Sequence, residues 1–187
     1  MPRRTSTVIR TATRADLAAM RAIVDAQVGH GYLDAEVDAL YKDSEGFALV
    51  AVVDGSVAGV CMCSIMKPGA MARIFRSGLP DVLRSRKVGL LDTLAVRPDL
   101  TGRGLGTALL EEARGRFRSD KVRVWATPAW RSRLGTTVES LLTRAGMEPF
   151  AEVPDFWREA SLAEGFICPV CGAPPCECSA VMYAGPT

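Results

Sequence analysis

Three glycines that lead into a helix form the first group of residues whose spacing suggests chemistry. They alternate within residues 101–107, after a predicted strand and at the start of a helix expected over residues 104–117. Glycines let backbone N–H groups turn towards one point, and a helix N-terminus adds a partial positive charge. The segment therefore predicts a phosphate or pyrophosphate site rather than a plain strand-to-helix turn. The residues expected to form it are Thr101, Gly102, Arg103, Gly104, Leu105, Gly106 and Thr107.

Four cysteines close together near the C-terminus form the second group. They are Cys168, Cys171, Cys176 and Cys178. A Cys-x-x-Cys pair followed by glycine brings two sulfurs to one ion, and four thiolates suit a structural zinc ion with no position left for water. We therefore predict a zinc site with a folding or docking role. An iron centre or a redox pair are the alternatives, and the tight Cys-x-Cys half keeps them open.

Two familiar phosphate-binding loops do not match the glycine segment. The dinucleotide fingerprint requires its third glycine at position 107, where this chain has Thr107. The nucleoside-triphosphate loop requires a Gly-Lys-Ser/Thr ending, which the sequence lacks. A different phosphate-bearing ligand is therefore expected.

The stretch from Leu91 to Leu110 resembles the GCN5-related N-acetyltransferase (GNAT) family. That family's acyl-CoA motif is Gln/Arg-x-x-Gly-x-Gly/Ala between a strand and a helix, and Thr101-Gly-Arg-Gly104-Leu-Gly106 matches it except at Thr101. The flanking Leu-Ala-Val, Arg-Pro-Asp and Ala-Leu-Leu also resemble the family. The order of predicted elements agrees from Val8 to about Phe150, or about four-fifths of the chain.

The resemblance implies an α/β fold of the GNAT type. Such a fold has a mixed, mostly antiparallel central sheet of about six strands, flanked by helices and splayed between strands 4 and 5. Acetyl-CoA would lie in that opening, with its pantetheine arm along the backbone of Leu94, Ala95 and Val96 and its pyrophosphate on residues 101–107. The implied activity is direct transfer of an acetyl group to a primary amine of a small molecule or protein.

The resemblance also indicates one catalytic side chain and the loss of another. Asp92 lies four residues before Val96, where the family often has an acidic base that accepts the amine proton. The family's usual proton donor, a tyrosine four residues before the glycine that ends the last helix, is replaced by Leu142, and an assisting asparagine by Gly135. A different acyl-CoA or a variant acyl transfer on the same fold is therefore the main alternative.

Hydrophobic periodicity places these residues on a series of strands and helices. Asp54-Gly55 is a strong hairpin signal between two apolar runs, and Thr13 with Asp16 marks a helix start. Strands are expected at 8–10, 47–53, 57–63, 88–96, 122–125 and 147–153, helices from 17 to about 24 and at 33–41, 104–117 and 134–144, and one or two helical turns in a basic insertion at 66–87. We divide the chain into an acyltransferase domain, 1–153, and a tail with the cysteine site, 154–187, in which no periodicity is detected.

Composition limits the partners. The 187 residues carry a net charge of +2, which argues against nucleic acid, and the sequence has no apolar run of signal-peptide or membrane-spanning length. We expect a cytoplasmic protein with no membrane partner, for which a homodimer is compatible with the sequence. A binding module, in which the zinc knuckle grips nucleic acid or protein on a GNAT scaffold, is the third alternative.

A few other side chains are candidates for the acceptor pocket or for plain core. Trp125, Trp130, Phe156 and Trp157 lie near predicted strand ends. His30, the one histidine, lies in a loop on the rim where substrates enter this fold, whereas Cys61 and Cys63 share one face of a strand and suit small buried positions.

Overall fold

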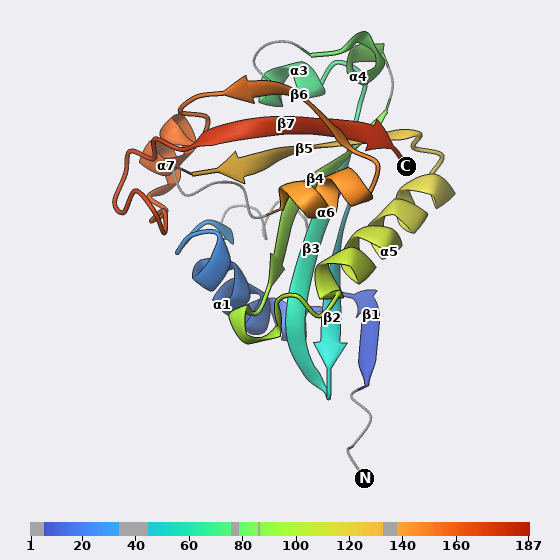
Figure 1. The fold of residues 1–187 in the computed structure, drawn as a ribbon, viewed down its shortest axis with the longest axis vertical. Helices are drawn as coiled ribbons and strands as arrows, with labels where there is room; N and C mark the ends of the chain where they lie inside the picture. Colours follow the sequence, from blue (N-terminus) through green and yellow to red (C-terminus); the bar gives the residue numbers. More distant parts are fainter. Residues whose placement is uncertain (1–5, 34–44, 76–78, 86, 133–137) are drawn as a thin grey trace.

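The fold is organised around one seven-stranded sheet with the order β1-β2-β3-β4-β5-β7-β6 (Figure 1). The computed structural model describes residues 6–33, 45–75, 79–85, 87–132 and 138–187. The strands are β1 (Thr7–Thr11), β2 (Gly46–Val53), β3 (Ser56–Met66), β4 (Val88–Val96), β5 (Val124–Arg131), β6 (Glu148–Val153) and β7 (Ser179–Pro186). The helices are α1 (Leu17–Gln27), α3 (Met71–Ile74), α4 (Asp81–Ser85), α5 (Leu105–Ser119), α6 (Glu139–Arg144) and α7 (Arg158–Glu164), with 3-10 turns at Arg14–Asp16 and Pro98–Leu100.

The sheet divides between β4 and β5. These two strands are parallel and pair only at Gly89↔Trp125 and Leu90↔Ala126, whereas all other neighbouring strands are antiparallel. Beyond Leu90 the strands separate, so that β1–β4 run down the view in Figure 1 while β5, β7 and β6 cross its upper part. The predicted α/β GNAT fold with a splay between the fourth and fifth strands is confirmed.

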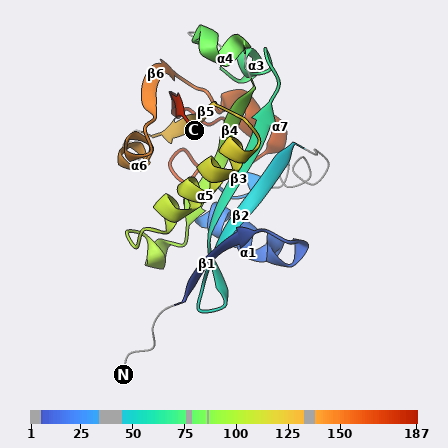
Figure 2. The same ribbon diagram turned by 90° about the vertical axis from the view of Figure 1, so that its right-hand side faces the viewer.

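Helices cover both faces of the β1–β4 half, as Figure 2 shows from the side. On one face α1 packs its apolar stripe against β2, β3 and β4; on the other α5 does the same. The buried residues contributed by α1 are Met20, Ile23 and Val24, and those contributed by α5 are Leu105, Leu109, Leu110, Ala113 and Phe117. This spacing of three and four residues is what the amphipathic pattern predicted.

Two short-range signals in the sequence are confirmed. Asp54 and Gly55 have φ of 48° and 83° and close the hairpin between β2 and β3, because a two-residue turn of this type needs positive φ at both positions. At the start of α1, the Asp16 carboxylate accepts hydrogen bonds from Thr13 N (2.7 Å) and Thr13 Oγ1 (2.8 Å). Arg10 donates two more, at 2.7 and 2.8 Å.

Regular structure continues beyond residue 153, where the sequence shows no periodicity and no strand or helix was expected. β7 lies between β5 and β6 inside the sheet, with a continuous run of buried residues from Ala180 to Tyr183. A strand covered on both faces shows no alternation, and the preceding cysteines and prolines made the segment look like an irregular tail. The division at residue 153 therefore does not coincide with an edge of the sheet.

β5 is longer than predicted, because it continues through Pro128 to Arg131. Proline has no N–H group to donate to a neighbouring strand. At Pro128, β4 has already separated from β5, so no hydrogen bond between these two strands is lost. The predicted insertion holds α3 and α4, which pack on the sheet beside β6 and β7. The helix expected at 33–41 and the start of the one at 134 lie mostly outside the described residues. None of the described helices is long and apolar enough to cross a membrane.

Candidate active site and metal centre

A cavity of about 450 Å³ opens where β4 and β5 separate. Its wall combines α1, β4, the loop before α5, the first turn of α5, β5, α6 and the segment after α7. The sheet's divergence creates the space, since strands that no longer pair leave two edges facing each other across a gap. The predicted cofactor loop, the predicted acid and two of the four clustered cysteines all line this one cavity.

The glycine loop presents backbone groups to the cavity. Gly102 and Gly104 have φ of 74° and 81°, and a side chain built on either would meet no protein atom within 4 Å. Ala108 N donates to Gly104 O at 3.0 Å, so the first three N–H groups of α5 have no carbonyl one turn earlier within the helix. All seven predicted loop residues except Arg103 line the cavity; Arg103 is exposed.

The edge of β4 that faces the cavity carries backbone polar groups. Arg97 N donates to Ala58 O of β3. The backbone N–H and C=O groups of neighbouring residues in a strand point to alternate edges, so those of Leu94 and Val96 point away from β3, towards the open edge. Gln27, at the end of α1, donates to Val96 O at 2.8 Å. Leu94, Ala95 and Val96 all line the cavity, as an added-strand interaction with an extended ligand requires.

Asp92 is the extra residue of a β-bulge in β4. Opposite β3, the consecutive residues Met62 and Cys63 pair with Thr93 and Leu91, so Asp92 is the residue inserted between the two pairs. Bulges re-aim a side chain next to a site, and Asp92 lines the cavity. Ser64 Oγ donates to Asp92 Oδ2 at 2.9 Å and orients the carboxylate. The opening of the cleft thus has one carboxylate held on the strand edge.

Leu142 occupies the position of the family's tyrosine and lines the cavity, with 1% of its surface exposed. A hydrocarbon side chain cannot donate a proton, so α6 supplies none at this position. Gly135, the position of the assisting asparagine, lies outside the described residues.

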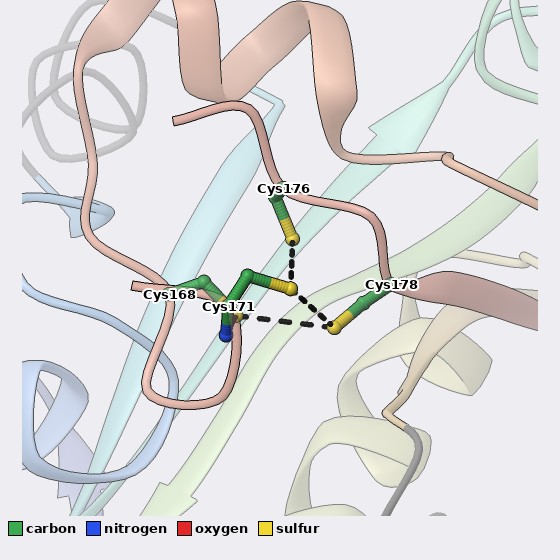
Figure 3. A group of neighbouring side chains, drawn as sticks. All are labelled: Cys168, Cys171, Cys176 and Cys178. Carbon is green, nitrogen blue, oxygen red and sulfur yellow. Dashed lines mark hydrogen bonds between the residues drawn. The ribbon is translucent and has the colours of Figure 1, made fainter. Parts of the chain in front are cut away.

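The four cysteines converge on one point (Figure 3). Their sulfur atoms all lie within 4.8 Å of one another, with individual separations of 3.5 Å (Cys171 to Cys178), 3.9 Å (Cys168 to Cys178) and 4.0 Å (Cys171 to Cys176). Four sulfurs at about 2.3 Å from a tetrahedral zinc ion would be about 3.8 Å apart. The donor set therefore fits zinc in both type and spacing.

The surroundings of the sulfurs also suit a cation. Burial raises the pKa of the Cys176 thiol, and burial together with the neighbouring thiols raises that of Cys178 to about 12. Burial acts in the same direction on Cys171, but a hydrogen bond from Glu177 N, at 3.4 Å, and bonds with the other cysteines bring its pKa below the usual value. Thiolates packed this closely need a positive ion to offset their repulsion.

Several aromatic residues line the end of the cavity next to the cysteines. Trp130 and Trp157, both candidates from the sequence, line it together with Tyr32 and Phe166. Trp125 is instead fully buried in the core against Phe117.

The remaining sequence candidates lie away from the lining. Phe156 packs on Trp157. The His30 side chain is 73% exposed, with its Nδ1 3.0 Å from Asp25 Oδ2. Cys61 and Cys63 are buried in the core as expected, with their sulfurs 3.7 Å apart.

The chain matches the model of the acetyltransferase (GNAT) family over residues 17–132, more than half of its length. It therefore belongs to the GNAT acetyltransferases, which transfer an acyl group from acetyl-CoA to an acceptor. The sequence has no significant match among curated proteins.

Solved structures agree with this assignment. The fold is similar to NAA60 from Arabidopsis thaliana, determined with a bisubstrate analogue (TM-score 0.72, 14% identity, 97% of this chain and 98% of that one). It is also similar to a ribosomal-protein-alanine N-acetyltransferase from Brucella melitensis (TM-score 0.65, 20% identity, 96% and 99%). An IAA acetyltransferase from Bacillus cereus is a further relative (TM-score 0.67, 16% identity, 97% and 100%). At such low identities the similarity shows the fold alone.

Several residues that line or support the cavity were not found from the sequence. Gln27 and Tyr32 reach the cavity from α1 and the turn after it, Ser64 reaches Asp92 from β3, and Arg144 lines the cavity from α6. Leu141, three residues before Arg144, lies next to Gly106, since a side chain built on that glycine would meet it at 3.2 Å. No local pattern marks these positions, because each depends on contacts between distant segments.

Proposed function

We propose that this chain is an N-acetyltransferase that moves an acetyl group from acetyl-CoA directly to a primary amine of a small molecule or protein. The observation that carries the proposal is the single cavity that joins the N-terminus of α5 to the carboxylate of Asp92. The helix N-terminus suits the phosphates of the cofactor and the carboxylate suits the proton of the amine, and both groups line the same cavity. A cytoplasmic location, the absence of nucleic-acid binding and a homodimer stay predictions.

The residues proposed for acetyl-CoA follow from the geometry of the two backbone edges. N–H groups of residues 101–107 would hold the pyrophosphate, because they surround a helix N-terminus and no side chain blocks the approach. The pantetheine arm would lie along Leu94, Ala95 and Val96. Arg144 is a second arginine, besides Arg103, with access to the phosphates, and it lines the cavity whereas Arg103 does not.

Asp92 is proposed as the general base. An amine arrives as an ammonium ion at neutral pH and must lose a proton before its nitrogen can bond to the acetyl carbon. Asp92 accepts that proton, directly or through a water molecule, and Ser64 keeps the carboxylate oriented towards the cleft. As the C–N bond forms, the C–S bond breaks and the sulfur leaves as a thiolate.

The four cysteines are proposed to hold a structural zinc ion. With all four coordination positions taken by sulfur, such a site has no place for water, so its contribution is to folding. Mass spectrometry of the native protein, scoring bound CoA and metal together, tests both ligands at once. Finding no bound metal, or a bound metal other than zinc, would remove this part of the proposal.

A thiol-release screen across primary amines tests the transfer itself. We expect release of free CoA only when an amine is present. A protein that fails to bind CoA would contradict the whole proposal, since the loop would then serve only as a turn.

Transfer of a different acyl group, or a variant acyl transfer, is the second candidate. Leu142 favours it, because an apolar side chain in place of the family's tyrosine lines the same cavity. Binding of CoA with no thiol released on any amine, followed by turnover with another acyl-CoA, would select this alternative.

A further inference from the structure

Aromatic rings and two sulfur atoms wall one end of the cavity. Tyr32, Trp130, Trp157 and Phe166 line it together with Cys168 and Cys176. The rings pack on one another and on the cysteines, with Tyr32 in edge contact with Phe166 (5.4 Å between centroids) and Trp157 (6.0 Å). In Figure 1 the segment after α7 lies at the left of the molecule, whereas α5 begins lower and nearer the middle. The glycine loop and the segment after α7 thus lie in different parts of the cavity wall, which we call the glycine-loop end and the aromatic end.

Three of the four rings are tied to the cysteine segment by specific contacts. Trp130 packs in the same buried cluster as Cys178, and its backbone pairs with Ala180, two residues after that cysteine. Ile167, directly before Cys168, exchanges backbone hydrogen bonds with His30 and so holds the turn that carries Tyr32 (3.1 and 2.9 Å).

The third tie reaches α7, which begins just after Trp157. Cys176 N donates to Ser161 Oγ at 2.9 Å, and Ser161 is fully buried in that helix. The fourth ring, Phe166, is two residues from Cys168 in the chain and belongs to the same buried cluster. The cysteine segment therefore contacts the elements that carry all four rings.

The two ends of the cavity differ in charge. The glycine-loop end has the positive end of α5, with Arg144 nearby. The other end is lined by aromatic rings, a side-chain type that attracts cations, and four thiolates around a zinc ion would add a net charge of about −2. Among the described residues that line the cavity, Asp92 and Arg144 are the charged ones, so the aromatic end has no basic side chain in that set.

We propose that Tyr32, Trp130, Trp157 and Phe166 form the acceptor subsite for a cationic amine, and that a metal ion on the four cysteines holds this subsite in shape. The inference rests on the proposed function, because an acceptor subsite presupposes acyl transfer. It adds the charge class of the acceptor and a role for the metal in acceptor binding rather than in binding CoA.

The charge class is tested with n-butylamine, a cation at pH 7, against 1-butanol, a neutral molecule of the same size. Binding to the metal-loaded protein saturated with CoA is followed by tryptophan fluorescence and by NMR. We expect the amine to bind about tenfold more tightly than the alcohol. Equal affinities, or no binding of the amine, would overturn the cationic class.

Ring variants test the location. Tyr32→Leu and Trp157→Leu should each weaken n-butylamine binding about tenfold, whereas Tyr32→Phe, which keeps the ring, should stay within about twofold of the wild type. Phe150→Leu is the matched control, because Phe150 stacks on Phe75 outside the cavity lining. Equal effects of Trp157→Leu and Phe150→Leu would contradict the subsite.

Cys171→Ser tests the role of the metal, because Cys171 is exposed and does not line the cavity. We expect the metal content to fall well below about one ion per chain, n-butylamine affinity to fall about tenfold, and the Kd for CoA to change by less than about twofold. Chelator treatment of the wild type repeats the test should serine still bind metal. Unchanged amine binding without metal, or an equal loss of CoA binding, would overturn the proposal. Failure of the proposed function is distinguishable, since it would appear as missing CoA binding or thiol release in the metal-loaded wild type.

Discussion

The two ends of the cavity are built from the chain in different ways. The glycine-loop end consists mainly of one contiguous segment, residues 101–107, whose glycines and helix start define the geometry locally. The aromatic end combines Tyr32, Trp130, Trp157 and the cysteine segment, which are separated by up to about 140 residues in sequence and meet only in the folded sheet. A local motif can be recognised in any sequence that contains it, whereas an assembled wall depends on every element that positions it.

This difference predicts how damage spreads. A change at Gly102 or Gly104 should affect one ligand and leave the fold intact, because these two positions face open space. A change in the cysteine segment should affect several elements together, because β7 begins at Ser179, directly after Cys178, and lies inside the sheet.

Gly104→Glu should have the largest effect. A carboxylate at the proposed pyrophosphate site repels the ligand, and φ of 81° is strained for glutamate, so CoA binding should weaken at least about 1000-fold, or about 4 kcal/mol. Isothermal titration calorimetry measures it. Gly69→Glu is the matched control, since Gly69 has φ of 80° and equally open surroundings away from the cavity. Similar CoA affinities in the two variants would contradict the proposal that the glycine loop binds the pyrophosphate.

Metal removal should come next and should act on stability. Loss of an ion that binds only the folded state lowers the unfolding free energy by about 3 kcal/mol at metal concentrations of about 100 times the Kd, or about 6–12 °C in Tm. Scanning calorimetry with and without chelator measures the change, with Cys61→Ala as a control for loss of a cysteine outside the cluster. An unchanged Tm would mean that metal binding by the cysteine segment does not stabilise the sheet.

Asp92→Asn should slow turnover about 100-fold while leaving CoA affinity unchanged, because it removes a base and keeps the shape. Steady-state kinetics with an amine from the thiol-release screen provide kcat and KM. The exposed Asp120→Asn, at the far end of α5, is the control. Unchanged turnover in Asp92→Asn would exclude the acid from the site.

Asp16→Asn should destabilise the protein by about 2 kcal/mol, because the buried carboxylate accepts hydrogen bonds from Arg10 and Thr13 at the start of the helix that leads to Gln27 and Tyr32. The Arg10 guanidinium holds the pKa of Asp16 well below its usual 3.8. A lowered folded-state pKa stabilises fully above the unfolded value and progressively less as pH falls below about 4. The difference between wild type and variant, measured by urea unfolding, should therefore be constant near neutral pH and shrink below about pH 4. A constant difference down to pH 2 would contradict the role of the carboxylate charge.

The two arginines should have the smallest effects, and Arg144→Ala should weaken CoA binding about tenfold through loss of a contact to phosphate. Arg103→Ala is compared with it, and we expect about threefold, because that side chain does not line the cavity. The reverse order would mean that the loop arginine expected from the sequence makes the stronger contact.

Local signals predicted much of this molecule correctly. The predicted Asp54-Gly55 turn agrees with the observed hairpin, the predicted strand 88–96 with β4, and the predicted helix after the glycine loop with α5. Each of these depends on residues adjacent in sequence. β7 was missed because a strand that is buried on both faces shows no alternation of apolar and polar residues. The predicted end of β5 was too early because Pro128 can lie within the strand only where β4 has separated from it. Arg144 and Gln27 had no signal at all.

The sequence by itself determined the glycine loop, the four thiols available to a metal and the order of strands and helices that identify the family, because backbone freedom and ligand chemistry are properties of residue types and their spacing. Only the tertiary structure decided that Asp92 falls on a bulge and that two of the cysteines line the aromatic end of the cavity. It also placed the last strand inside the sheet. These depend on which distant segments pack together, and burial of apolar surface between them is a property of the whole chain.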